Sequence, residues 1–188
     1  MPLPIAHSVI SASMYVAYKG SLSIKDDYKW LALFMSVGLF PDVDFITVPF
    51  MGFGSHRGFT HSFLFAFIIT TLIFVYLKKR DSALTARFWS FLFLTMAIHP
   101  LCDFFTYDYL VERGGVKLFS PFSERYFESP VPIFMGIELR YLHTIFSAHT
   151  LLALAYETFI SGLLFLTVFY FKTGSLNLDR VLRDRAED

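Results

Sequence analysis

An apolar run without a charged residue, residues 63–77, begins directly after a segment that carries two histidines and an arginine, residues 54–62. A helix that crosses the hydrocarbon core of a membrane needs about 20 mostly apolar residues, so the run predicts a membrane helix. A second pair of metal-type residues, His99 and Asp103, lies inside another apolar stretch. Ionisable side chains are costly in a membrane and usually mark function. The pattern predicts a functional site built on membrane helices.

The composition agrees with a membrane protein. The chain has 188 residues, of which 55% are hydrophobic and 17% charged, and its mean hydropathy is +0.52. Soluble domains carry about 25% charged residues. The formal net charge is zero, so no nucleic-acid partner is expected. The single cysteine, Cys102, excludes an internal disulfide and a cysteine-rich zinc site.

The predicted fold class is all-α, an integral membrane helix bundle with about five membrane helices. The expected helices are residues 4–18, 30–40 (continuing less regularly to 50), 59–77, 87–107 and 149–171. The first two are short for a full span, and the second is the least regular. Residues 108–148 form a long extracytoplasmic loop, which we expect to pack as a cap. Residues 1–172 are expected to be one membrane-embedded hydrolase domain, and residues 173–188 a polar cytoplasmic tail.

The distribution of lysine and arginine sets the expected orientation. With the N-terminus outside and five spans, eleven of the sixteen lysines and arginines fall in inside segments. This excess follows the positive-inside rule and predicts an N-out, C-in topology. All metal-type residues then gather at the extracytoplasmic face of the membrane. They are His7, Asp42, Asp44, His56, His61, His99, Asp103 and His149.

The spacing of these residues suits metal binding. His99 and Asp103 are four apart, so on a helix they lie one turn apart on the same face. His56 and His61 are five apart and would diverge by about 140° on one helix, so they converge only if His56 lies in the loop before it. Histidine nitrogen with carboxylate oxygen suits zinc, and equally manganese or iron.

The number of candidate ligands favours two ions. A catalytic zinc takes about three protein ligands and a water, fewer than the chain offers. Asp42 and Asp44 follow Pro41 on a turn where both can face one way, so one can bind metal while the other orients a histidine. Two ions would clamp the attacking and leaving oxygens of a phosphate ester.

The expected function is that of a metal-dependent hydrolase with a metal-bound hydroxide as nucleophile. Arg57 would neutralise the phosphate, and Asp44 or Glu157 would act as general base. A lipid or lipid-linked phosphate, reached from the outer leaflet of the bilayer, is the expected substrate.

Other interpretations remain open. His149 and Glu157 can equally be packing residues held by hydrogen bonds. The whole pattern could also belong to an ion or proton pathway, to a haem held by His99 and His149, or to a non-catalytic interaction protein. The polar residues gather at one face only, which disfavours a pathway, and haem leaves the aspartates and Arg57 unexplained.

Four short motifs resemble those of the YdjM-type family of bacterial membrane-bound metal-dependent hydrolases. They are Pro41-Asp42-Val43-Asp44, His56-Arg57-Gly58-Phe59-Thr60-His61-Ser62, His99-Pro100-Leu101-Cys102-Asp103 and Leu118-Phe119-Ser120-Pro121-Phe122. The resemblance runs from His7 to about Pro132, and the second motif is quite specific. It implies a multi-helix protein of the bacterial inner (cytoplasmic) membrane, with a metal site made by these residues.

The order of candidate ligands is also similar, more faintly, to that in the zinc-dependent phospholipase C and single-strand nuclease superfamily. Those all-helical enzymes follow an early Asp and His with His-x-x-x-Asp, as His99 and Asp103 are spaced here, and then with another His and an acidic residue. The last pair departs from their pattern, because His149 and Glu157 are eight apart rather than four. This similarity implies hydrolysis of a phosphate ester.

Overall fold

Five α-helices and no sheet make up the described part of the chain, which is residues 4–46, 56–107, 115–137 and 147–174 of a computed structural model. The helices are α1 (Pro4–Lys19), α2 (Ile24–Leu39), α4 (Phe63–Lys78), α5 (Ala86–Phe104) and α7 (Ala148–Thr173). Two 3-10 helices, η1 (Phe40–Ile46) and η3 (Phe59–His61), lie between α2 and α4. The only β pairs in these ranges are isolated bridges. The all-α prediction is confirmed.

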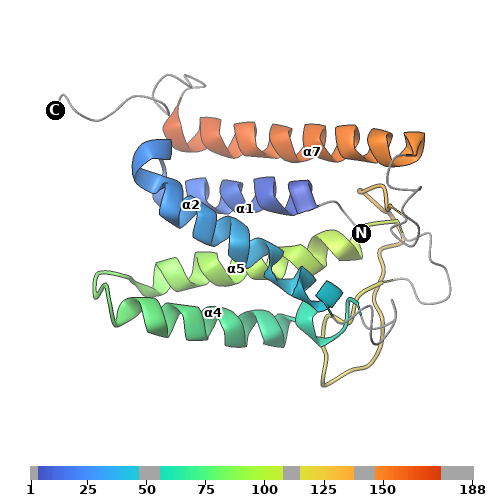
Figure 1. Ribbon diagram of the computed structural model, residues 1–188, viewed down its shortest axis with the longest axis horizontal. Helices are drawn as coiled ribbons and strands as arrows, with labels where there is room; N and C mark the ends of the chain where they lie inside the picture. Colours follow the sequence, from blue (N-terminus) through green and yellow to red (C-terminus); the bar gives the residue numbers. More distant parts are fainter. Residues whose placement is uncertain (1–3, 47–55, 108–114, 138–146, 175–188) are drawn as a thin grey trace.

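The five helices lie side by side along the long axis of the molecule (Figure 1). α1 packs against α2, α5 and α7, and α4 packs on the far side of α5. The first turns of α1, α4 and α7 lie at the same end as the last turns of α2 and α5 (Figure 1). The predicted convergence of these chain segments at one end is therefore present.

Two helix boundaries differ from the prediction. α2 begins at Ile24, six residues before the expected start, because Ser23 precedes two acidic residues that stabilise a first helical turn. The backbone N–H of Ser23 donates to the Asp27 carboxylate at 2.8 Å. Beyond Leu39 the chain continues as the 3-10 helix η1 to Ile46, in agreement with the less regular continuation expected there. Residues 47–50 of that continuation lie outside the described ranges.

The third predicted helix is interrupted near its start. Ser62 adopts an extended conformation and caps α4 by accepting the Phe65 N–H at 3.1 Å. His61 therefore belongs to η3 and not to the α-helix. The direction of the His61 side chain is therefore set by η3 and not by the axis of α4.

Aromatic and aliphatic side chains fill the middle of the bundle. The core consists of Tyr15, Phe34, Val37, Ala66, Leu84, Phe88, Leu92, Met96 and Ala97, which come from α1, α2, α4, α5 and the α4–α5 turn. Large rings such as Phe34 and Phe88 contact one another edge to face, with centroids 5.9 Å apart. This core fixes the helices that carry the site at their ends.

Residues 115–137 of the predicted cap pack on the end of the bundle. Phe63 N–H donates to the Leu118 carbonyl at 3.0 Å, and the N–H groups of Ile133 and Phe134 donate to the Phe105 carbonyl. Val116 and Leu118 are buried. The described part of the loop is thus a packed cover, as predicted.

One described helix is long and apolar enough to cross a membrane. α7 has 26 residues, and only 17% of its most apolar 18-residue window is buried. α4 is a shorter apolar helix. The structure gives the number of helices predicted, and among the described helices α7 is the one whose length and composition would allow it to span a membrane.

Candidate metal centre

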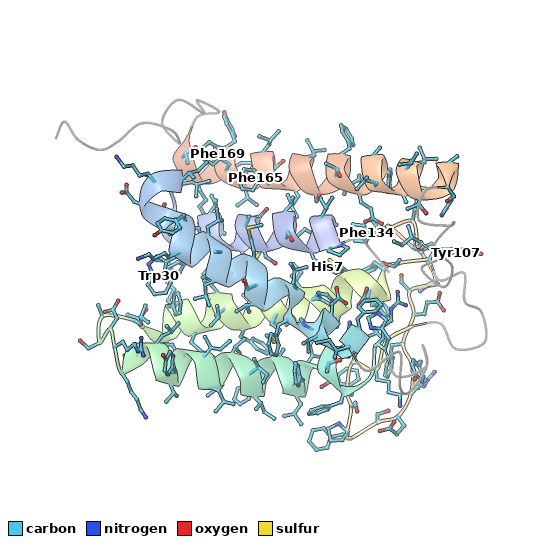
Figure 2. All side chains as sticks on the ribbon, in the orientation of Figure 1. His7, Trp30, Tyr107, Phe134, Phe165 and Phe169 are labelled. Carbon is cyan, nitrogen blue, oxygen red and sulfur yellow. The ribbon has the colours of Figure 1, made fainter. Side chains whose placement is uncertain are left out.

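Seven histidine and aspartate residues meet at the end of the bundle where η1 lies. They form two groups, Asp42, Asp44, His56 and His61 in one, and His7, His99 and Asp103 in the other. In each group the candidate ligand atoms lie within 4.8 Å of one another. We call the seven residues together the His/Asp cluster. Figure 2 places His7 at this end of α1, and Trp30 marks the opposite end of the bundle.

Four atoms of the cluster have the spacing of ligands around one tetrahedral ion. His61 Nε2 lies 3.5 Å from Asp42 Oδ1 and 3.3 Å from Asp103 Oδ2. His99 Nε2 lies 3.3 Å and 3.6 Å from the same two oxygens. Zinc bonds of about 2.0–2.2 Å give a tetrahedron with edges of about 3.3–3.6 Å. Four of its six edges are therefore present.

These four atoms are buried and make no hydrogen bond within the described residues. A buried polar atom without a partner costs about 1–3 kcal/mol, and more if it is charged. Two carboxylate oxygens and two ring nitrogens this close together need positive charge between them, which ring protons or a bound cation can supply. The donor set and its spacing therefore fit a divalent metal ion.

In His99 and His61, the contact made by Nδ1 determines that the other ring nitrogen, Nε2, faces the cluster. His99 Nδ1 lies 2.7 Å from the Gly38 carbonyl, which can only accept, so Nδ1 carries the proton and donates. His61 Nδ1 lies 3.0 Å from the Thr60 hydroxyl and 3.3 Å from Asp44 Oδ2. Both rings thus present Nε2 inward. Metal-binding histidines are usually held in this way by an acceptor behind them.

Asp44 occupies this supporting position. Its Oδ2 accepts the Thr60 hydroxyl at 2.7 Å and the Arg57 backbone N–H at 3.2 Å. Its Oδ1 lies 2.7 Å from His56 Nδ1. Both Asp42 oxygens, in contrast, make no hydrogen bond within the described ranges. Asp42 is therefore the ligand-like member of the pair, and Asp44 orients its neighbours.

Arg57 joins the cluster through a special backbone conformation. Its φ of 63° lies in the left-handed region, which is uncommon for a residue other than glycine. Its carbonyl accepts the Lys117 N–H at 3.2 Å. The guanidinium is buried, with one nitrogen 3.9 Å from Asp103 Oδ1. This places a positive charge at the edge of the cluster, where the sequence predicted a phosphate-binding group.

His7 lies against the cluster from α1. Its ring stacks on that of His99 with centroids 3.8 Å apart and an interplanar angle of 14°. It is buried, and neither of its nitrogens makes a hydrogen bond within the described part of the chain. His7 and the second oxygen of Asp103 could therefore contribute to another ion.

The electrostatics outside the α-helices follow from mutual contacts. Burial alone would lower the pKa of His61, but Asp42, Asp44 and Asp103 beside its ring raise it to about 9. Burial lowers the pKa of His56, and its hydrogen bond to Asp44 only partly offsets this. Although burial opposes it, the histidines hold the pKa values of the Asp42 and Asp44 carboxyls far below their usual range.

Two predicted site residues lie outside both groups. The His149 Nε2 lies 2.9 Å from the Gly136 carbonyl. Glu157 is buried on α7. Neither belongs to a described group of candidate ligands, and their roles as ligand and general base stay predictions.

Two further residues support the cluster and were not foreseen. The Thr60 hydroxyl bridges Asp44 and His61, and the Gly38 carbonyl holds His99. Thr60 stands next to a candidate ligand inside the predicted motif, which could have drawn attention to it. Gly38 contributes a backbone atom 61 residues away from His99, so the sequence carries no sign of its role.

Comparisons with known proteins identify a family and a relative of this chain. The chain matches the family described as YdjM inner membrane protein over residues 1–177. It is 28% identical over 134 residues to the inner membrane protein YbcI of Escherichia coli (strain K12), covering 69% of this chain and 73% of that protein. No solved structure matches the chain. With nearly its whole length matched, the chain belongs to the YdjM inner membrane protein family.

Proposed function

We propose that this protein is a metal-dependent hydrolase of phosphate esters. The observation that carries the proposal is the set of four buried atoms at tetrahedral spacing, His61 Nε2, His99 Nε2, Asp42 Oδ1 and Asp103 Oδ2. Such a mixed nitrogen and oxygen set suits zinc, and also manganese or iron. A second ion would use His7 with the other oxygen of Asp103.

A divalent ion held there would supply two effects, since it lowers the pKa of a water molecule and polarises a phosphoryl oxygen. The residues of the chain do the rest. Arg57 is placed to bind a phosphate oxygen next to Asp103.

The pair of His56 and Asp44 is placed to move a proton. Because burial lowers the pKa of His56, its ring is neutral near pH 7 and can accept a proton from the attacking water. Asp44 holds that ring at 2.7 Å and stabilises it once charged. The water oxygen then bonds to phosphorus and the ester P–O bond breaks, and the departing alkoxide takes the proton from His56 and leaves as an alcohol.

The protein is proposed to sit in the membrane with its N-terminus outside and its C-terminus inside, which puts the cluster at the extracytoplasmic face. Four of the helices would then cross or enter the bilayer alongside α7. α4 measures about 24 Å at 1.5 Å per residue, slightly less than a hydrocarbon core of about 30 Å. A short span of this kind brings its ends, and the cluster, into the membrane interface.

Metal content tests the proposal first. Detergent-purified wild type, His99→Ala/Asp103→Ala and a matched control on the same helix, Leu94→Ala, are reconstituted with zinc or manganese and measured by mass spectrometry. Leu94 is an exposed side chain on α5. We expect about two ions per chain in wild type and control, and nearly none in the double variant.

Cleavage of p-nitrophenyl phosphate and bis(p-nitrophenyl) phosphate is then compared across the three proteins. Turnover that follows metal content supports a phosphoesterase. No bound metal in the wild type after reconstitution would overturn the proposal, provided that circular dichroism shows a folded helical protein.

A further inference from the structure

The 3-10 helix η1 has an apolar face on its outer side. A 3-10 helix has about three residues per turn, so every third side chain lines up. Phe40, Val43 and Ile46 form one such line, and they are 40%, 42% and 69% exposed. We call these three residues the apolar stripe. The same short helix turns Asp42 and Asp44 inward to the cluster, so η1 separates an ionic side from an apolar side.

The cluster comes nearest to the surface at η1. The side chains of His61, His99 and Asp103 are at most 1% exposed, whereas that of Asp42 is 13% exposed. Among the four residues that supply the atoms with tetrahedral spacing, Asp42 of η1 is therefore the most exposed to solvent. Val43 of the stripe follows Asp42 directly in the sequence, so the apolar side of η1 begins next to this residue.

The stripe continues onto α4 through aromatic contacts. Phe40 stacks on Phe65 with centroids 6.1 Å apart, and Phe59 of η3 packs edge-on against Phe65 at 5.6 Å. Phe59 is itself 43% exposed. Further along α4, the exposed residues Ile68, Leu72 and Val75 are also apolar, and at 100° per residue they lie within about 80° of Phe65 around the helix. An apolar surface thus leads from η1 along this helix.

We propose that the apolar stripe and Phe59 bind the acyl chain of a membrane phospholipid, and that the phosphate of this lipid reaches the His/Asp cluster at Asp42, its most exposed ligand-like residue. This inference rests on the proposed function and names its substrate class, a lipid phosphate ester. Hydrocarbon is the medium beside α4 in an inner membrane protein, and Arg57 supplies the cation that a phosphate needs. An acyl chain on the stripe holds the ester next to Asp42.

The test compares two ligands that cannot be cleaved, because a carbon replaces the ester oxygen. One is the phosphonate analogue of dioleoyl phosphatidic acid, and the other is the matching analogue of glycerol phosphate, which has no acyl chain. Both are bound to the metal-loaded full-length protein in detergent. The variant Val43→Ser/Ile46→Ser is set beside Leu163→Ser/Leu166→Ser, an equally apolar exposed pair on α7.

We expect the stripe variant to bind the dioleoyl analogue on the order of tenfold more weakly than wild type, with unchanged binding of the glycerol analogue. The α7 variant should match wild type with both ligands. Equal weakening by the two double variants, or wild-type binding that does not improve with acyl chains, would overturn the inference. Failure of the proposed function would show differently, as no bound metal and no cleavage of p-nitrophenyl phosphate.

Discussion

Asp42 and Asp44 are two residues apart, carry the same side chain, and have different surroundings. Asp44 is held by Thr60, His56 and the Arg57 backbone, while Asp42 faces His61 and His99 directly. On a 3-10 helix, residues two apart point about 120° away from each other. In the proposed metal site, the Asp42 carboxylate would bind the ion directly, and the Asp44 carboxylate would hold the side chains around it.

We predict that Asp42→Asn and Asp44→Asn weaken metal binding to different extents. Asp42→Asn removes a charged ligand and should nearly abolish binding. Asp44→Asn loses only support for the histidines, which typically costs about 10–100-fold in affinity. Competition with a chelator of known affinity measures both. Equal losses in the two variants would contradict the assignment of Asp44 as an orienting residue.

The pH dependence of metal binding should follow His61. Its pKa is raised to about 9 in the metal-free protein, so near neutral pH the ring is protonated and an ion must displace one proton from Nε2. The apparent affinity is therefore expected to rise about tenfold per pH unit from about pH 6 to about pH 8, and to level off above about pH 9. Isothermal titration in buffers of different ionisation enthalpy counts the released protons. Binding without proton release near pH 7 would show that His61 is not a ligand.

The sequence predicted the members of the cluster better than their roles. His99 and Asp103 follow from helical spacing, and the placement of His56 in a loop follows from its distance to His61. The division of labour between Asp42 and Asp44 depends on the rotation of a 3-10 helix, for which the sequence has no periodic signal. Support from a backbone carbonyl such as that of Gly38 likewise has no side chain to reveal it.

At the scale of elements, the contact of α1 with α2 is set by the absence of a side chain. A Cβ added to Gly38 would lie 1.8 Å from Ser11 Oγ and 2.9 Å from Ser11 Cβ. Ser11 is itself buried, and its hydroxyl donates to the His7 carbonyl. The close approach thus joins Gly38, whose carbonyl holds His99, to Ser11, whose hydroxyl bonds to the His7 carbonyl. Both sides of this contact are therefore next to the cluster.

Gly38→Ala is predicted to destabilise the protein by about 1–3 kcal/mol, because overpacking forces the two helices apart. It should also lower metal affinity, since the Gly38 carbonyl moves away from His99. The control is Gly162→Ala on α7, where an added Cβ meets nothing within 4 Å. There alanine should stabilise the helix by up to about 1 kcal/mol. Thermal unfolding in detergent checks both, and similar shifts in the two variants would disprove the close-packing argument.

Apolar runs located all five described helices, but their ends depended on capping. The expected start of α2 was wrong because the apolar run begins only at Trp30, whereas Asp26 and Asp27 lie in the first helical turn, where acidic side chains are favourable. The break at Ser62 was missed, although serine is a common N-cap residue and the apolar run begins directly after it. An apolar run in the sequence indicates which residues are buried in lipid or in the core. The hydrogen bonds of the cap residues determine where the helix begins, and an apolar run does not reveal them.

At the scale of the whole molecule, the cluster and the turn between α4 and α5 lie at opposite ends of the bundle (Figure 1). Away from the cluster, Arg87 lies over the Tyr18 ring at 5.6 Å and Arg80 over the Tyr76 ring at 4.7 Å. Cations beside aromatic rings are typical of a membrane interface, and basic residues prefer the cytoplasmic side. The convergence of the site residues was predicted from this topology alone, because helix order fixes which ends meet.

Cysteine labelling on intact cells tests the orientation. In a Cys102→Ser background, Phe122→Cys replaces an 83% exposed residue of the cap, and Lys79→Cys an exposed residue at the other end. A membrane-impermeant maleimide should modify the first before lysis and the second only afterwards. The reverse order would put the cluster in the cytoplasm and overturn the N-out topology.

The cluster gathers residues from α1 through α5, so it cannot exist until the chain has been made and inserted as far as Asp103. With the proposed orientation, its residues have by then left the cytoplasm. The ion would be acquired outside the cell's metal-buffered interior, without help from cytosolic metal carriers. Since intrinsic affinity follows the same order among divalent metals in most sites, the supply in that outer compartment would decide which metal this protein carries.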